Sequence, residues 1–122
     1  MASPVTILYV DDEDALRTLV KNQLISEGYE VETADDGDTA INLLKSRTFG
    51  IVLLDVRMPR VNGMEVLKFI RAGNIASRVI MLTAVDDLSV AIESVKLGAN
   101  DYLTKPYDLN VLLSAIERVI AM

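Results

Sequence analysis

Apolar runs that end abruptly at polar side chains recur along the chain. Three of these runs, at residues 5–10, 51–54 and 79–82, are almost continuously apolar. A strand with this pattern is buried on both faces, as in a parallel sheet that helices cover on either side. Two other segments are typical of sheet edges, because residues 30–34 alternate in polarity and residues 101–103 are very short. The pattern predicts a five-stranded parallel sheet in the order 2-1-3-4-5, an order known for doubly wound, flavodoxin-like α/β folds.

Helical periodicity separates the predicted strands. The first apolar stripe ends before Gly28, which is suited to stop a helix, and the third begins with Asn62 and Glu65 in a capping-box arrangement. The last stripe is the clearest and has Asp108 as its expected N-cap. Five helices are therefore expected to cover both faces of the sheet. Their apolar stripes are Leu16, Leu19, Val20 and Leu24; Ala40, Ile41 and Leu44; Met64, Leu67 and Ile70; Ala91 and Val95; and Leu109, Leu112, Leu113, Ile116, Val119 and Ile120.

The length and composition are those of one globular domain. A chain of 122 residues with 51% hydrophobic and 25% charged residues can bury an aliphatic core without disulfides or a structural metal. No linker, repeat or low-complexity segment is visible, so residues 1–122 are expected to form a single domain with no output domain attached. No signal peptide and no apolar run of ~20 residues is visible, so we expect a cytoplasmic protein without membrane association.

The charge and the missing residue types exclude several functions. A net charge of −6 disfavours direct nucleic-acid binding, which depends on clustered Lys and Arg. The chain has no cysteine, which excludes disulfides, thiolate catalysis and cysteine-based zinc sites. It also has no histidine, so it cannot use a histidine base, a histidine metal ligand or a phosphohistidine. Any phosphoryl donor must therefore be another molecule.

Polar residues that follow the predicted strands would meet at one edge of the sheet, the edge where open α/β folds bind ligands. Asp11 and Asp12 follow the first strand, Asp55 the third, Thr83 the fourth and Lys105 the fifth. Two like charges about 4 Å apart repel by ~4 kcal/mol at an effective dielectric of about 20, so the clustered carboxylates predict a divalent cation. Oxygen ligands without nitrogen or sulfur favour Mg²⁺, with Mn²⁺ or Ca²⁺ as alternatives.

Each of these residues also has a simpler interpretation. Asp11 and Asp12 could cap the first helix, and Asp55 could be a metal ligand only. Beside Mg²⁺, however, the Asp55 carboxylate could attack a phosphoryl group and form an aspartyl phosphate. Thr83 could then donate its hydroxyl to that group, and Lys105 could neutralise its oxygens. Without the acids, Thr83 would be a turn residue and Lys105 a solvated cation.

Two further residues near this edge have open interpretations. A cis bond between Lys105 and Pro106 would aim the lysine inward, although only ~5–6% of X–Pro bonds are cis. Tyr102 lies on the short last strand, where periodicity alone indicates a half-buried core aromatic.

Four stretches, in this order, resemble the receiver domain of two-component response regulators, the family that includes the chemotaxis regulator. They are ILYVDDE at 7–13, IVLLDVRMPRVNG at 51–63, VIMLTA at 79–84 and GANDYLTKP at 98–106. The similarity covers essentially the whole chain. Gly50 departs from the polar residue that the family often carries, but it lies at the far end of its strand. The resemblance implies a signalling domain that catalyses only its own phosphorylation and dephosphorylation, and not an enzyme with a separate substrate.

The resemblance also implies a role for each acidic residue. Asp55 is implied as the phosphoacceptor, and as a Mg²⁺ ligand together with Asp12 and the main-chain carbonyl of Arg57. Asp11 is implied as the second acidic residue, acting largely through metal-bound water. The phosphoryl group would come from the phosphohistidine of a histidine kinase or of a phosphotransfer protein.

A conformational switch is implied by the same resemblance. Thr83 and Lys105 are the implied phosphate-sensing pair, and Tyr102 is the implied switch aromatic, which turns inward when Thr83 moves toward the phosphate. The affected surface would comprise the fourth helix, the fifth strand and the fifth helix, and it is a possible homodimer face. Arg57 and Val85 are the implied positions that set the phosphoryl lifetime.

Two alternatives remain open at this point. A phosphatase of the haloacid-dehalogenase type also uses an Asp nucleophile with Mg²⁺, but it places a second Asp two residues later, where this chain has Arg57, and it carries further segments. The chain could also be a receiver fragment of a larger transcription factor or hybrid kinase, whose output domain lies outside this sequence.

Overall fold

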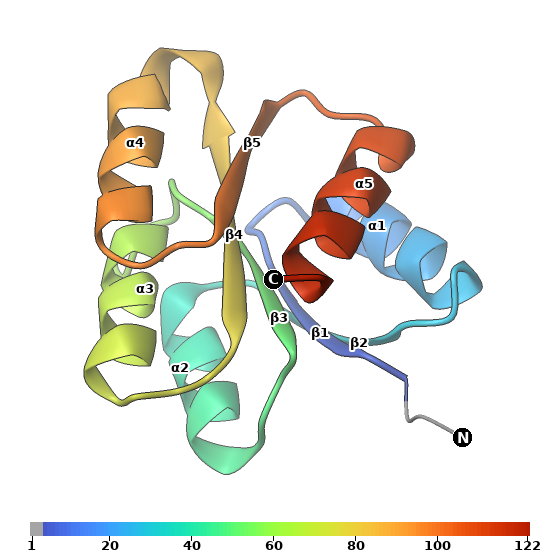
Figure 1. Ribbon diagram of the computed structural model, residues 1–122, viewed down its shortest axis with the longest axis horizontal. Helices are drawn as coiled ribbons and strands as arrows, with labels where there is room; N and C mark the ends of the chain where they lie inside the picture. Colours follow the sequence, from blue (N-terminus) through green and yellow to red (C-terminus); the bar gives the residue numbers. More distant parts are fainter. Residues whose placement is uncertain (1–3) are drawn as a thin grey trace.

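The computed structural model describes residues 4–122, and its centre is a sheet of five parallel strands (Figure 1). The strand order is β2-β1-β3-β4-β5, which confirms the predicted doubly wound, flavodoxin-like topology. In the middle of the sheet, Tyr9 of β1 lies opposite Thr33 of β2 and Leu53 of β3. The strands are β1 (Thr6–Val10), β2 (Glu30–Ala34), β3 (Ile51–Asp55), β4 (Arg78–Ala84) and β5 (Asp101–Lys105).

Helices connect successive strands, and side-chain caps mark where three of them begin. Asp36, Asn62 and Asp108 each accept a hydrogen bond from the backbone N–H three residues later, which satisfies a donor that the first helical turn leaves free. Gly28 has a φ of +96°, a left-handed conformation that suits glycine just after a helix. The helices are α1 (Asp14–Ser26), α2 (Gly37–Ser46), α3 (Gly63–Ala72), α4 (Leu88–Lys96) and α5 (Leu109–Ile120), with a short 3₁₀ turn η1 (Val85–Asp87) before α4.

The helices form two layers, with α1 and α5 on one face of the sheet and α2, α3 and α4 on the other (Figure 1). Side chains along each central strand alternate between the two resulting cores. Leu8 and Val10 of β1 face the α2–α4 layer, whereas Ile7 and Tyr9 face α1 and α5. The central strands are therefore buried on both faces, which is the physical reason for their continuously apolar sequence.

Three strands extend beyond their apolar runs. β3 includes Asp55, β4 includes Thr83 and β5 includes Lys105. These residues thus lie at the carboxyl ends of the strands themselves. The sequence pattern places them in the loops that follow the strands. Backbone pairing holds their positions, because Asp55 lies opposite Leu82, and Thr83 opposite Thr104.

Three residues that the sequence assigns to buried helical stripes lie on the surface instead. Leu19 of α1 is 54% exposed, Val95 of α4 is 44% exposed and Ile120 of α5 is 39% exposed. In α4 the buried face is formed by Ala91 and Ser94, so the prediction for Val95 is wrong by one position. A turn of 3.6 residues makes neighbouring positions hard to separate when a stripe contains few apolar residues.

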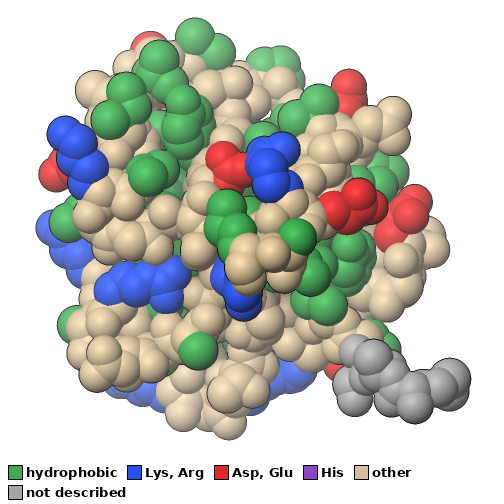
Figure 2. Space-filling model, viewed as in Figure 1, with side chains coloured by type: hydrophobic (Ala, Val, Ile, Leu, Met, Phe, Trp, Pro, Cys, Tyr) green, Lys and Arg blue, Asp and Glu red, His purple; other side chains and the backbone are tan. Residues whose placement is uncertain are grey.

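Apolar side chains also gather on the outer surface of α4. Leu88, Ile92 and Val95 are all exposed, and Figure 2 shows hydrophobic atoms grouped in the region where Figure 1 places α4. Across residues 4–122, every helix is too short or too polar to span a lipid bilayer.

Candidate functional site

The acidic residues predicted to cluster do so at the carboxyl edge of the sheet. Asp11 and Asp12 follow β1, and Asp55 is the last residue of β3, the strand paired with β1. One carboxylate oxygen from each of the three acids lies within 4.8 Å of the others. Asp11 is fully buried and Asp55 is 6% exposed, whereas Asp12 is open to solvent. Parallel strand pairing therefore assembles a site from acids that are far apart in the sequence.

Hydrogen bonds hold the Asp11 carboxylate in one orientation. Its Oδ1 accepts from the backbone N–H of Glu13 at 2.9 Å. Its Oδ2 accepts from the Tyr9 hydroxyl and from Lys105 Nζ, each at 3.1 Å. A buried charge without such partners would be strongly unfavourable. The bond to Glu13 also shows that Asp11, and not Asp12, makes the local contact just before α1.

Lys105 connects two of the acids and leaves the site acidic. Its Nζ lies 3.1 Å from Asp11 Oδ2 and 3.4 Å from Asp55 Oδ2. Burial alone would lower the pKa of Lys105, but the Asp55 and Asp11 carboxylates outweigh it and raise the pKa. Burial raises the pKa of Asp55 to about 6; Lys105 opposes this effect, and Asp11 and Asp12 add to it. One ammonium group therefore does not compensate the clustered carboxylates.

Thr83 and Tyr102 lie on neighbouring strands beside the cluster, without a hydrogen bond to it. The buried Thr83 hydroxyl is directed toward the β4–α4 connection, at 3.3 Å from the carbonyl oxygen of Ala84 and 3.4 Å from that of Asp87. Tyr102 of β5 is half-buried and packs against the core on the α2–α4 side of the sheet. The structure thus brings the acids and the lysine together, whereas Thr83 lies on the strand next to that of Asp55 and Tyr102 packs into the core.

Arg57 and Pro106 occupy loops that flank the acids. Arg57 lies on the loop between β3 and α3, and its guanidinium pairs with Asp87 of η1. The bond between Lys105 and Pro106 is cis, the isomer that the sequence left open. Pro106 borders a cavity of about 330 Å³, whose other lining residues are Glu13, Leu16, Lys105 and Tyr107.

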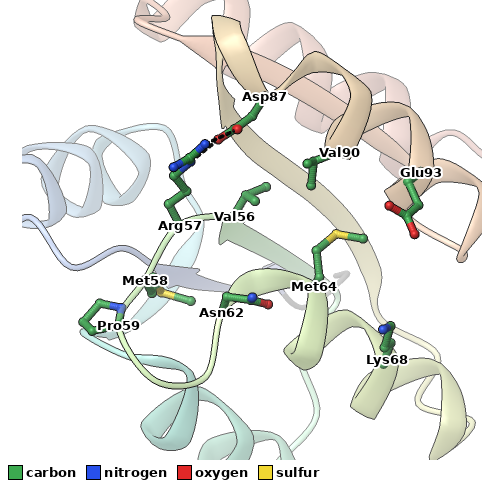
Figure 3. Close-up of a pocket in the computed structure, with 10 residues that line it drawn as sticks. All are labelled: Val56, Arg57, Met58, Pro59, Asn62, Met64, Lys68, Asp87, Val90 and Glu93. Atoms are coloured by element: carbon green, nitrogen blue, oxygen red, sulfur yellow. Dashed lines mark hydrogen bonds and ion pairs between the residues drawn. The ribbon is translucent and has the colours of Figure 1, made fainter.

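A second, more open cavity of about 700 Å³ lies beside the acidic cluster, between the β3–α3 loop, α3 and α4 (Figure 3). Met64 of α3 and Val90 of α4 contribute to opposite walls. The ion pair between Arg57 and Asp87 spans one end of it (Figure 3). None of the three clustered acids lines this cavity, so it is a neighbouring feature and not the acidic site itself.

Two tyrosines that support the site were not recognised in the sequence. The hydroxyl of Tyr9, which donates to Asp11, lies 3.3 Å from the hydroxyl of Tyr107. Burial, and then the contact with Tyr107, raise the pKa of Tyr9, so its hydroxyl remains a proton donor. The sequence did contain a signal for Tyr9, because it is the one aromatic residue of the first predicted strand. It lies two residues before Asp11, and side chains two residues apart point to the same face of a strand.

Gly63 and Asp87 were also missed. A Cβ atom on Gly63 would lie 2.3 Å from the main-chain oxygen of Asp55, so the start of α3 can approach the end of β3 only with glycine there. Asp87 is buried although its partner Arg57 is largely exposed. The sequence contains a glycine and an acid at these positions, but nothing in its local pattern reveals their partners.

Comparison with known proteins shows what the chain is similar to. Residues 7–117 match the family described as Response regulator receiver domain. The chain is 39% identical over 117 residues to the response regulator MprA of Mycolicibacterium vanbaalenii, covering 96% of this chain and 51% of MprA. It is 35% identical over 116 residues to the regulatory protein AtoC of Escherichia coli strain K12, covering 95% of this chain and 25% of AtoC. The chain therefore spans between a quarter and a half of the length of these relatives.

A solved structure agrees with the sequence match. The chemotaxis protein CheY4 of Vibrio cholerae has a TM-score of 0.88 to this chain at 33% identity, covering 95% of this chain and 98% of CheY4. The family match over residues 7–117 includes the strand ends that carry Asp11, Asp55 and Lys105. Because the family match, the relatives and the structural likeness all extend over nearly the whole chain, this protein belongs to the response regulator receiver domain family.

Proposed function

We propose that this receiver domain accepts a phosphoryl group on Asp55 as part of a two-component signalling system. The observation that carries the proposal is the nearly buried Asp55 carboxylate, which lies among other acids and 3.4 Å from Lys105 Nζ. An Asp55 oxygen would attack phosphorus, forming the acyl phosphate as the bond to the donor breaks. Lys105 is placed to neutralise oxygens of the transferred group. Incorporation of one phosphoryl group from acetyl phosphate in the presence of Mg²⁺ tests the proposal.

Magnesium is the cofactor that this site fits best. The donor set consists of oxygens only, and three carboxylate oxygens lie within 4.8 Å of one another. Asp12, Asp55 and the main-chain carbonyl of Arg57 would hold the ion, and Asp11 would act through a bound water. When bound, the ion neutralises charge on the phosphoryl oxygens. The excess of carboxylates over ammonium groups at this edge supports a divalent cation over a monovalent one.

Mg²⁺ is expected to stabilise the wild-type protein more than an Asp12→Ala variant. A ligand at a hundred times its dissociation constant stabilises the folded state by about 2.7 kcal/mol. Loss of Asp12 removes one carboxylate from the cluster and weakens binding, so the thermal shift shrinks. Thermal unfolding with and without Mg²⁺ measures this difference, with Asp14→Ala as the control for an exposed acid in the first turn of α1. Equal shifts in wild type and Asp12→Ala would contradict the assignment of the metal site.

Phosphorylation is expected to change the position of Thr83 and Tyr102 as well as the phosphate pocket. The phosphoryl group adds about −1.5 to −2 charges and new acceptor oxygens. The Thr83 hydroxyl, whose present acceptors are 3.3 and 3.4 Å away, is weakly bonded and can move to the phosphoryl group. Its movement makes space for the half-buried Tyr102 ring. The surface formed by α4, β5 and α5 would respond, as a partner-binding or homodimer face.

An NMR comparison with a beryllofluoride complex measures this switch. Signals of α4, β5 and α5 are expected to shift together with those near Asp55. A ligand moves an equilibrium only between states that it binds differently. Shifts confined to the phosphate pocket would therefore rule out the switch.

The aspartyl phosphate is expected to hydrolyse slowly compared with fast-cycling receivers. Val85, two residues after Thr83, is 70% exposed and has no group that can orient an attacking water. A positioned general base commonly accelerates such a reaction by ~10²–10⁴-fold. The Val85 side chain has no group that can act as a base. Val85→Glu and Val85→Lys supply polar groups at this position, and phosphate release from each variant measures the effect. A fast wild-type rate that neither substitution changes would exclude a role for Val85.

The proposed phosphoryl donor is a histidine kinase or a phosphotransfer protein, because the chain has no histidine of its own. Receiver domains of response regulators are generally not enzymes, and we propose that this one catalyses only its own phosphorylation and dephosphorylation. We further propose that residues 1–122 act as one receiver unit in the cytoplasm, without contacting nucleic acid directly. The lengths of MprA and AtoC support a second setting, in which such a unit belongs to a larger transcription regulator.

A further inference from the structure

The ion pair between Arg57 and Asp87 joins the two loops that border the acidic cluster (Figure 3). Arg57 donates from Nε to one carboxylate oxygen of Asp87 and from Nη2 to the other. The Asp87 side chain is 7% exposed, whereas that of Arg57 is 72% exposed. Asp87 is therefore the enclosed partner of the pair, and Arg57 is the partner that faces solvent.

Asp87 is also linked to the site through its backbone. The Thr83 hydroxyl lies 3.4 Å from the Asp87 carbonyl oxygen, so one residue contacts both Thr83 and Arg57. Asp87 immediately precedes α4. If the Asp87 side chain lost its partner, the change would therefore be located at the start of α4.

Arg57 does not neutralise Asp55 in this structure. Its guanidinium donates two hydrogen bonds to the Asp87 carboxylate. The cation beside Asp55 is instead Lys105, whose Nζ lies 3.4 Å from Asp55 Oδ2. Arg57, two residues after Asp55, thus pairs with the Asp87 carboxylate and not with that of Asp55.

We propose that Asp87 is a positioning residue that withholds the Arg57 guanidinium from Asp55, and that a phosphoryl group on Asp55 competes with Asp87 for it. This inference rests on the proposed phosphorylation of Asp55. Arginine binds carboxylate and phosphate in the same bidentate geometry, so the two groups are direct competitors. A phosphoryl group carries about −1.5 to −2 charges against one for Asp87, which favours the exchange.

The test compares the beryllofluoride affinity of variants at the two positions, measured by NMR titration in Mg²⁺ and 0.15 M salt. Asp87→Asn keeps the shape of the side chain and removes the charge that holds Arg57. It is expected to lower the half-saturating concentration about threefold, the scale of one partly exposed ion pair. Asp87→Glu retains a carboxylate and is expected to restore the wild-type value. In an Arg57→Gln background, Asp87→Asn is expected to have no further effect.

Asp86→Asn is the matched control, because it removes the same charge from the exposed neighbouring residue. At this salt concentration an exposed charge is largely screened, so the affinity is expected to stay at the wild-type value. An unchanged affinity in Asp87→Asn, or an equal gain in the Arg57→Gln background, would overturn the proposal. A wild type that binds no beryllofluoride defeats the proposed function and the exchange with it. The Nε–H resonance of Arg57 in the free protein still reports separately whether Asp87 holds the guanidinium.

Discussion

Replacement of Asp55 by asparagine is expected to abolish phosphorylation by acetyl phosphate. The amide nitrogen and oxygen of asparagine carry no negative charge, so the nucleophile is lost while the shape of the side chain is kept. Asp11 is no substitute, because it is fully buried and both of its oxygens already accept hydrogen bonds. Intact-mass measurement after incubation with acetyl phosphate and Mg²⁺ reads out the addition of one phosphoryl group.

The matched control is Asp38→Asn, which changes an exposed acid in the first turn of α2. This variant is expected to be phosphorylated to the same extent as the wild type. The assignment of Asp55 is wrong if Asp55→Asn is labelled as fully as the control. Labelling that is lost in both variants would point to a general effect on folding, which far-UV circular dichroism detects.

The metal-free protein is expected to lose about 2 kcal/mol of stability from Asp55 alone as the pH rises from about 4 to 7. Burial raises the folded-state pKa of Asp55 to about 6 from its ordinary 3.8, against the opposing effect of Lys105. The folded protein thus binds a proton that the unfolded chain has released. This contribution to stability is complete below pH 3.8 and is lost as the pH rises through about 6.

Urea unfolding of wild type and Asp55→Asn in EDTA isolates this effect. Other acids, such as Asp36 and Asp87, have lowered pKa values and act in the opposite direction, but they are common to both proteins and cancel in the difference. The asparagine variant is expected to gain stability relative to the wild type between pH 4 and 7. Saturating Mg²⁺ neutralises the cluster and should remove most of the gain. A difference that stays constant across this pH range would contradict the raised pKa of Asp55 in the folded protein.

The strand order and the acidic cluster could be predicted because both depend on patterns that are local in the sequence. Continuous apolar runs indicate strands buried on both faces, and the residue that ends each run lies at the same edge of a parallel sheet. Asp11, Asp55 and Lys105 meet for this reason. The same reasoning was less successful for helices, where Leu19 and Val95 were predicted to be buried but are exposed. The sequence does not distinguish an exposed leucine or valine from a buried one.

The sequence by itself determined which side chains reach the functional edge, because strand length and side-chain alternation set that position residue by residue. Only the tertiary structure decided what those side chains touch. The pairing of Arg57 with Asp87 and the close approach of Gly63 to Asp55 depend on how separate loops pack against one another. Periodicity reports whether a position is buried, but it carries no information about the distance between two loops. The partner of a charged side chain near this edge therefore becomes visible only when the whole sheet and its helices are assembled.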